Sequence, residues 1–296
     1  MGKMEKRGVK FVLGLLILVF LGCFSFRSEA ATEEEIKQSR TNLTPQETEE
    51  LTKNLIRERG NADEFLRMLG MLNPNPDLID ACIKAGADVN ARDEDGETAL
   101  MAAAKHNKNP EVVAALIKNG ADVNARDEKT WTALMRAVMG RADIEVINAL
   151  IKGGADVNAS TQDDFGMTAL IMAAGLENPE VVTALLRGGA DVNARNGVNM
   201  TALMMAAMMS ENPDILTALL EGGAEVNSKR EKGVTALTLA ALMNKNPEAV
   251  TVLLKGGADA KMRDEDGKMA IDYAKDNEKL VDTDAFRALQ EASSSY

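Results

Sequence analysis

Apolar side chains recur at helical spacing through most of the chain, and the pattern repeats about every 34 residues. Within residues 93–126 it predicts a helix from Ala99 to about His106 and a second helix that begins at Pro110. The predicted buried positions are Leu100, Ala103 and Ala104 on the first helix and Val113, Leu116 and Ile117 on the second. Each unit is therefore a pair of short amphipathic helices, which can bury its apolar faces only against neighbouring units.

Turn and capping residues separate these helices at fixed places in the unit. Asp95-Gly96 predicts a tight turn before the first helix, because glycine adopts the positive φ that such a turn requires. Thr98 offers a hydroxyl cap to the first helix, whereas Asn109 caps the second. A glycine then ends the second helix of each unit as a left-handed C-cap, at Gly86, Gly120, Gly154, Gly189, Gly223 and Gly257.

Three short phrases mark the repeat. Gly-Ala-Asp-Val-Asn-Ala or a close variant starts at each of these glycines, and Thr-Ala-Leu and Asn-Pro-Glu or Asn-Pro-Asp phrases keep the same period. The Thr-Ala-Leu phrases start at Thr98, Thr132, Thr168, Thr201 and Thr235, and the prolines are Pro76, Pro110, Pro179, Pro213 and Pro247. Self-similarity at this period is typical of an all-α solenoid.

These residues resemble the ankyrin repeat family, whose units read D-x-x-G-x-T-P-L-H-x-A-A and close on L-L-x-x-G-A-D-V-N. The resemblance covers about residues 64–291. It implies helix-turn-helix units joined by β-turn hairpin loops, with five full repeats and two atypical end units. It also implies that the function is protein binding.

Two departures from the family pattern affect how the units are expected to hold together. Alanine replaces the family's proline in each Thr-Ala-Leu phrase. The family's histidine, which hydrogen-bonds neighbouring units, is replaced here by Met101, Met135, Ile171, Met204 or Thr238. Coupling between units is therefore expected to depend more on packing.

The first 60 residues carry none of these repeat phrases. Basic residues precede an apolar run over residues 11–23, and small residues follow up to Ala30, which is the order of a secretory signal peptide. We expect cleavage after Ala30 and export to the periplasm or the extracellular space. Lipidation of Cys23 and an uncleaved anchor are the alternatives, and only these two would bring the protein to a membrane.

Behind a signal peptide of residues 1–30, the chain is expected to divide into three parts. Residues 31–60 form a polar linker and a short N-terminal helix, residues 61–291 form the ankyrin repeat domain, and residues 292–296 form a C-terminal tail. A capping box that starts at Thr44 opens the N-terminal helix, which is predicted to cover the open end of the stack. We expect a monomer.

The net charge of the chain limits the classes of partner that it is expected to bind. The formal net charge is −12, which disfavours binding to nucleic acid and to anionic membrane surfaces. The acids are interpreted first as a solvated surface and alternatively as a site for a basic protein or peptide. In the second interpretation the acidic rim consists of Asp93, Asp127, Glu128, Asp163 and Asp164.

The sequence contains few residues that could carry out catalysis. His106 is the one histidine, which excludes histidine-based triads and histidine-rich zinc sites. No glycine-rich phosphate-binding loop follows a strand. Cys82 lies on a predicted helix and is interpreted as a small core residue. We therefore expect no enzymatic activity, no catalytic residue, no metal site and no cofactor.

The resemblance places the residue before each Thr-Ala-Leu phrase on the concave face, where it varies with the partner. Here that position holds Glu97, Trp131, Met167, Met200, Val234 and Lys268. The next concave positions hold Met139, Leu176, Met208, Met209, Leu242 and Met243. Apolar surface bordered by charge marks an interaction site, so the predicted contact residues are Trp131, Met167, Met200, Val234, Met139, Leu176, Met208 and Met209. For the helix methionines, burial in the core is the alternative.

The favoured interpretation is a non-enzymatic interaction module that holds a protein or peptide on its concave face, with Trp131 as the anchor. The alternative is Cu(I) binding or oxidant buffering by methionine, because thioethers bind Cu(I) and methionine sulfoxide forms reversibly. The residues concerned are Met200, Met204, Met205, Met208 and Met209.

Overall fold

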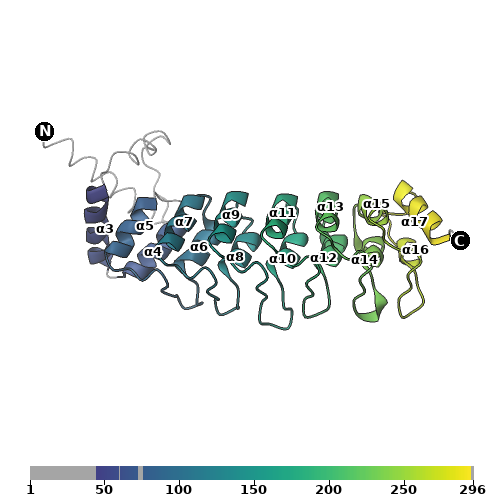
Figure 1. The fold of residues 1–296 in the computed structure, drawn as a ribbon, viewed down its shortest axis with the longest axis horizontal. Coiled ribbons are helices and arrows are strands. Elements are labelled where there is room, and N and C mark those ends of the chain that lie inside the picture. Colours follow the sequence, from purple (N-terminus) through teal and green to yellow (C-terminus); the bar gives the residue numbers. More distant parts are fainter. Residues whose placement is uncertain (1–44, 60, 73–75, 295–296) are drawn as a thin grey trace.

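The computed structural model describes residues 45–59, 61–72 and 76–294, which form one elongated row of helix pairs (Figure 1). The first helices of the units are α4 (Ala62–Met71), α6 (Ala99–His106), α8 (Ala133–Met139), α10 (Ala169–Ala174), α12 (Ala202–Met209), α14 (Ala236–Met243) and α16 (Ala270–Ala274). The second helices are α5 (Pro76–Lys84), α7 (Pro110–Lys118), α9 (Ile144–Lys152), α11 (Pro179–Arg187), α13 (Pro213–Glu221), α15 (Glu248–Lys255) and α17 (Asp284–Ser294). The predicted all-α solenoid of five full repeats between two end units is confirmed.

Hairpin loops join the units and project from one edge of the row (Figure 1). They contain no strand within the described residues. The antiparallel backbone pairing in these hairpins is limited to isolated bridges, between Arg92 and Thr98 and between Ser160 and Thr168. A short 3-10 turn, Glu231–Gly233, occupies one hairpin tip.

The predicted caps set the helix boundaries. The Thr98 hydroxyl accepts the N–H of Met101 at 3.3 Å, and the Asn109 side chain accepts the N–H of Glu111 at 3.0 Å. The threonine cap bond recurs at α8, α10, α12 and α14, so each of these first helices begins directly after its threonine. The last first helix, α16, follows Met269 instead, α9 begins without a side-chain cap bond, and Pro247, which precedes α15, makes none. The boundaries therefore follow from side chains that are visible in the sequence.

The paired glycines at the ends of the second helices have two different roles. Gly189 has a φ of 91°, the left-handed conformation predicted for a C-cap. Gly188 has an ordinary φ, but a Cβ atom there would lie 3.0 Å from Cγ2 of Ile151 on the preceding unit. The first glycine of the pair therefore lets neighbouring second helices approach closely.

The core is a continuous layer of small and aliphatic side chains that runs along the stack. Leu100, Leu134, Leu170, Leu203 and Leu237 occupy one equivalent position of the first helices, and each is at most 2% exposed. The residues that replace the family's histidine, Met101, Met135, Ile171, Met204 and Thr238, are also buried. Packing between units is therefore extensive, as expected.

Hydrogen bonds also couple every pair of central units, which the expectation of greater dependence on packing did not include. The Asn158 amide accepts the N–H of Asp191 at 2.8 Å and donates to the carbonyl of Gly189 at 3.0 Å. The equivalent asparagines of the closing phrases are Asn90, Asn124, Asn193 and Asn227, and they make the same two bonds. We call these contacts the asparagine bridges.

A second set of inter-unit bonds joins the hairpins. The Arg126 guanidinium donates to Thr130 O of its own hairpin at 2.8 Å and to Ser160 O of the next hairpin at 2.7 Å. Arg195 donates in the same way to Asn199 and Lys229. The hairpins are therefore held in register with one another.

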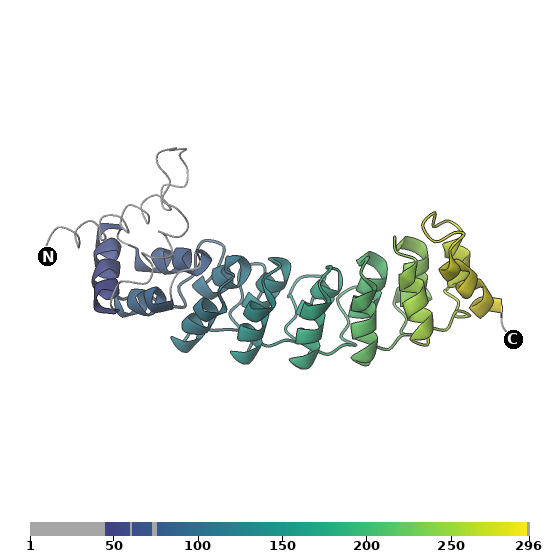
Figure 2. The ribbon, with the colours of Figure 1, turned by 90° about the horizontal axis from the view of Figure 1, so that it is seen from above.

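Both ends of the stack are covered by helices. At the amino end α3 (Pro45–Arg59) packs against α5, with the half-buried Ile56 against the core (Figure 2). At the carboxyl end α17 continues to Ser294, beyond the predicted end of the repeat domain at residue 291, and the Ser293 hydroxyl donates to Leu289 O.

The predicted signal peptide and most of the predicted linker, including Thr44, lie outside the described residues. Among the residues that are described, no helix combines the length and the apolar character needed to span a bilayer.

Removal of one asparagine bridge is expected to weaken the stack. Asn158→Ala deletes both bonds, and we expect the free energy of unfolding to fall by about 1–2 kcal/mol. The midpoint of urea unfolding, followed by circular dichroism, measures this change. Asn158→Asp keeps the acceptor, loses the donor and should show a smaller loss.

Asn148→Ala is the matched control for this experiment. Asn148 is exposed on α9 and makes no side-chain hydrogen bond to the described residues, so the same change there should be neutral or slightly stabilising. An equal loss of stability in both alanine variants would show that the bridge contributes nothing.

Candidate functional site

The predicted contact residues lie along the first helices at two levels. We call Trp131, Met167, Met200 and Val234 the hairpin row, because each directly precedes the cap of a first helix. We call Met139, Leu176, Met208, Met209, Leu242 and Met243 the helix-end row. Both rows cross the same four units, because neighbouring first helices pack side by side from α8 to α14.

The helix-end row is open to solvent. Met209 is 57% exposed, Met243 is 53% exposed and Met139 is 45% exposed, while Leu176 and Met208 are half-buried. The alternative that these helix methionines are ordinary core residues is therefore wrong for Met139 and Met209. About half of the surface of Met139, Met209 and Met243 therefore stays in contact with solvent.

The hairpin row is less exposed than predicted. Trp131, Met167 and Val234 are half-buried, but Met200 is only 5% exposed and belongs to the core. The prediction of Met200 as a contact residue is corrected on this ground. The flexible thioether chain of a methionine can turn inward and fill a gap, which the stiffer indole at the equivalent position cannot do.

Trp131 is held in place by a charged pair. The Arg136 guanidinium lies 5.4 Å from the centre of the Trp131 ring, and its Nε donates to Asp127 Oδ2 at 2.7 Å. The Asp127 side chain is fully buried, and its other oxygen accepts the N–H of Trp131. Asp127 was predicted in the acidic rim, and this is wrong because the carboxylate is covered and neutralised by Arg136.

Three further apolar side chains lie on the first helices between the two rows. Met172, Met205 and Leu239 occupy the helix position of Arg136 in the next three units. Met205 is half-buried, and the other two are buried. We call the two rows without Met200, together with the half-buried Met205, the apolar face.

Polar residues border the apolar face at both ends. The first full unit carries Glu97, Lys105 and His106 at the equivalent positions, and the last unit carries Lys268, Asp276 and Asn277. Partial burial, followed by the neighbouring Lys105 charge, lowers the pKa of His106. The exposed apolar row is therefore interrupted at the first full unit, before which Met71 and Leu72 at the end of α4 are also exposed, at 42% and 41%.

Two exposed apolar residues at the hairpin tips were also missed. Phe165 is 60% exposed and Val198 is 38% exposed. Their hairpins touch, because the N–H of Gly197 donates to Phe165 O at 2.8 Å. One feature of the sequence could have indicated the exposed Phe165. The third hairpin, before Thr168, is longer than the others, and Asp163 and Asp164 precede the phenylalanine in it.

A small cavity of about 210 Å³ adjoins the helix-end row. It lies between the loops that follow α8 and α10. Its lining consists of Val138, Arg141, Ala142, Ala173, Leu176, Glu177, Asn178 and Val181. Leu176 therefore presents one side to this cavity, which is large enough for an apolar side chain of a partner.

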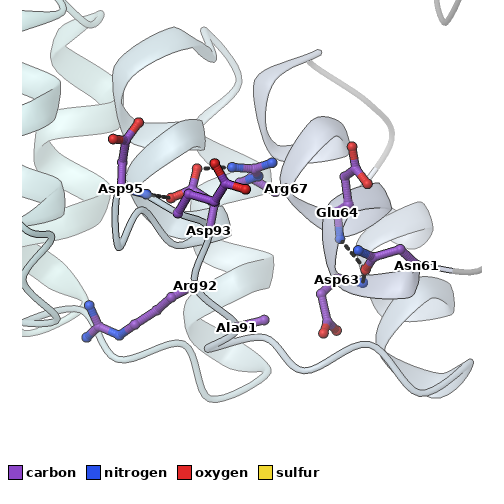
Figure 3. A pocket seen from close by; sticks show the side chains of 9 residues that line it. Asn61, Asp63, Glu64, Arg67, Ala91, Arg92, Asp93 and Asp95 are labelled. Carbon is purple, nitrogen blue, oxygen red and sulfur yellow. Dashed lines mark hydrogen bonds and ion pairs between the residues drawn. The ribbon is translucent and has the colours of Figure 1, made fainter.

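A larger groove of about 680 Å³ lies at the amino end, between α4 and the first hairpin (Figure 3). Its lining is polar: Asn61, Asp63, Glu64, Arg67, Ala91, Arg92, Asp93, Glu94 and Asp95. Several of these groups bond to one another, since Arg67 pairs with Asp93 and Asn61 accepts the N–H groups of Asp63 and Glu64. The groove is acidic on balance and lies outside the apolar face.

Side chains that could catalyse a reaction or bind a metal do not form a cluster in the described part of the chain. Cys82 is fully buried, its Sγ donates to Ala62 O at 3.6 Å, and burial raises the pKa of the thiol to about 12. No cluster of three or more His, Cys, Asp or Glu side chains with metal-site geometry occurs among the described residues. Of the methionines considered for Cu(I), Met200 and Met204 are buried, which leaves Met205, Met208 and Met209 at the surface.

Comparison with protein families identifies the repeat. A model of ankyrin repeats in three copies matches residues 68–161 and 141–230, and a second ankyrin repeat model with many copies matches residues 219–274. The chain belongs to the ankyrin repeat family. Proteins of this family are generally protein–protein interaction modules and typically are not enzymes.

A solved structure supports the same fold. The crystal structure of the human ASB11 ankyrin repeat domain is similar to this ankyrin repeat protein with a TM-score of 0.65 and 23% sequence identity. The match covers 78% of this chain and 98% of the human chain, and at this identity it shows the fold alone. No curated protein sequence matches the chain.

The buried thiol gives a direct test of the first helix pair. In a Cys23→Ser background, we expect Cys82 to react with a thiol reagent at pH 8 more than about 100-fold more slowly in the native protein than in urea, because thiolate is the reacting form. Absorbance of the released aromatic thiol measures the rate. Fast labelling of the native protein would place Cys82 at an accessible surface instead.

Proposed function

We propose that this ankyrin repeat protein is an exported, non-enzymatic interaction module that binds a protein or peptide on the apolar face. The observation that carries the proposal is the exposure of Met139, Met209 and Met243 on one row, with polar residues at both ends. Contiguous apolar surface with a polar border is characteristic of interaction sites.

The apolar face combines residues suited to different parts of binding. Trp131 is a large ring already fixed by Arg136, so little side-chain entropy is lost when a partner covers it. Methionines such as Met209 adapt to the shape of a partner because their side chains are unbranched and polarisable. The proposed anchor is therefore Trp131, and the helix-end row supplies the adjoining contact area.

Charge supports a basic partner. Asp163, Asp164 and Glu128 are exposed on hairpins beside the apolar face, and the whole chain carries a formal net charge of −12. Hydrogen bonds from Thr161 and from backbone N–H groups lower the pKa of Asp163, which keeps its carboxylate ionised at neutral pH. Such a field speeds association with a positively charged partner and slows it with an acidic one.

Binding through the apolar face can be tested by adding charge to it. We expect Met139→Glu/Met209→Glu to reduce capture of a partner from an envelope extract at least about 10-fold, because a carboxylate buried without a partner opposes binding. Quantitative mass spectrometry of captured proteins measures the effect, and circular dichroism checks the fold.

The matched control places the same charges on the second helices. Ala114 on α7 and Asn148 on α9 are exposed away from the apolar face, so Ala114→Glu/Asn148→Glu should capture as well as the parent. If both double variants capture the same partner equally, the apolar face is not the binding site.

Export is supported by the order of basic, apolar and small residues over residues 1–30. When the full chain is expressed in a bacterial host and the envelope fraction is sequenced from its amino terminus, we expect the mature protein to begin at Ala31. A lipid-modified amino terminus at Cys23 would support a lipoprotein, and an intact Met1 in the soluble cell interior would contradict export.

A further inference from the structure

The unit formed by α4 and α5 lacks the hairpin that precedes every later unit. α3 ends at Arg59 and α4 begins at Ala62, so only residues 60 and 61 connect them. The first hairpin of the stack, residues 91–98, therefore has no hairpin before it in the described part of the chain. The groove of about 680 Å³ lies at this place, between α4 and the first hairpin (Figure 3), and we call it the amino-end groove.

The later hairpins show which bonds a hairpin accepts from the one before it. A cationic side chain of the preceding hairpin donates to a backbone carbonyl of the next. The four contacts of this kind are Arg92 with Arg126, Arg126 with Ser160, Arg195 with Lys229 and Lys229 with Arg263. The carbonyl of Arg195 has no such donor, because the neutral Ser160 occupies the equivalent position in the hairpin before it.

A second hydrogen bond joins the same pairs of hairpins in the opposite direction. In four of the five later hairpins, the N–H two residues after this carbonyl donates to the preceding hairpin. The four bonds are Glu128 to Asp95 O, Gln162 to Thr130 Oγ1, Gly197 to Phe165 O and Glu265 to Lys232 O, at 2.7–3.0 Å. A carbonyl and an N–H, two residues apart, therefore form the edge that a hairpin presents to the unit before it.

On the first hairpin this edge is unpaired. The equivalent groups are the Arg92 carbonyl and the Glu94 N–H, and neither forms a hydrogen bond with the described residues. The hairpin has the same conformation as the next one, because the N–H of Asp93 donates to Glu97 O at 3.1 Å, as the N–H of Asp127 does in the second hairpin. The Arg92 side chain is directed away from α4, toward the second hairpin (Figure 3). The amino-end groove therefore contains one free backbone acceptor and one free backbone donor.

Carboxylates surround this unpaired edge. Arg67 neutralises Asp93 within the groove. The other carboxylates of the lining form no ion pair with the described residues, and they are Asp63, Glu64, Glu94 and Asp95. A guanidinium that donates to a carbonyl beside carboxylates makes stronger hydrogen bonds than a neutral donor does. The charge of the groove therefore selects for a cationic donor.

We propose that the amino-end groove binds a turn of a protein partner that carries an arginine. The guanidinium donates to the Arg92 carbonyl, and the carbonyl of the third residue after the arginine accepts the N–H of Glu94. This spacing is the one that the stack itself uses. Arg92 and Asp95 make both bonds to the second hairpin, and Lys229 and Lys232 make both bonds to the last one. The site is separate from the apolar face, and the inference does not depend on binding there.

A second copy of this chain is a poor occupant of the groove. Its last hairpin, residues 262–269, could offer Arg263 for the same bond. That hairpin also carries the exposed carboxylates of Glu265 and Asp266, and like charges oppose contact with the acidic groove. In addition, α3 packs against α5, where α17 of a preceding copy would lie if the stack continued. The partner is therefore a different protein, with a neutral or basic turn.

The probe for this inference is a cyclised hairpin peptide with the turn Arg-Asp-Lys-Asn-Gly-Lys and a norleucine on the opposite strand. It keeps the arginine, the aspartate and the glycine of the chain's own turns and replaces their other carboxylates. One control peptide has norleucine in place of the arginine. A second control exchanges the arginine with the norleucine of the opposite strand, so composition and net charge are unchanged.

With the full chain, we expect the probe to bind at least about 10-fold more tightly than either control peptide, because only the probe places a guanidinium at the Arg92 carbonyl. Isothermal titration calorimetry measures the affinities. In nitrogen-15-labelled protein, the probe should also shift the amide resonance of Glu94, and the control peptides should not.

Two substitutions test the groove from the side of the protein. Glu94→Pro removes the N–H and should weaken the probe about 3- to 10-fold. Glu94 is the second residue of a turn that the bond from Gly96 N–H to Asp93 O closes at 3.0 Å, and proline is favoured there, so the hairpin is retained. Glu64→Lys reverses a charge on the α4 side of the groove and should weaken the probe at least about 10-fold. Circular dichroism checks the fold of each variant, and Glu64→Lys remains a test if Glu94→Pro loses helicity.

The matched controls leave the groove intact. Glu265→Gln removes the same charge from the equivalent position of the last hairpin and should bind the probe as the parent does. Met139→Glu/Met209→Glu, which alters the apolar face, should also bind it normally. Equal binding of the probe and the exchanged peptide would overturn the inference, as would binding that neither Glu94→Pro nor Glu64→Lys weakens.

Hydrogen exchange and sedimentation test the other occupants. In the full chain alone, the Glu94 N–H should exchange without protection. Protection that disappears on deletion of residues 31–44 would place the chain's own amino-terminal segment in the groove. Self-association in sedimentation velocity that Glu94→Pro abolishes would place a second copy there. Either result would overturn the inference and leave the function proposed for the apolar face unaffected.

Discussion

The structure depends on the contact that each unit makes with the next, and the asparagine bridges fix that contact in one geometry. Both polar atoms of the Asn158 amide bind backbone groups of the following unit, so neither unit can slide without losing both bonds. A solenoid unit has no closed core of its own and is stable only through such neighbours. The asparagine bridges and the buried leucine layer therefore act together along the whole row.

The regular contacts between units determine which positions can be substituted without destabilising the fold. Leu134, Ala137 and the first glycine of each pair, such as Gly188, face a neighbouring unit and cannot change without a cavity or a clash. Met139 and Met209 are 45% and 57% exposed, so the fold would accept a polar residue there at a smaller cost. This exposed apolar area is what the partner proposed above would cover, and the same reasoning does not extend to the buried Met204.

The helices were predictable because their signals are local. Thr98, Asn109 and the glycines of the closing phrase act on the backbone within a few residues of themselves. The apolar face was predictable only in part, since equivalent positions differ in what lies beside them. Met200 turns into the core, whereas Trp131 lies under Arg136, and Asp127 is hidden by the same arginine. Such differences arise from neighbouring side chains, which a repeat pattern does not specify.

The two ends of the apolar face differ in how firmly their side chains are held. At its amino end Trp131 is fixed by a buried ion pair between Arg136 and Asp127, so its position is set before any partner arrives. At its carboxyl end Met209 and Met243 are exposed and flexible. In the binding mode proposed above, a partner would therefore have to fit the fixed ring closely but could vary in shape where it meets the methionines, which would concentrate selectivity at the Trp131 end of the face.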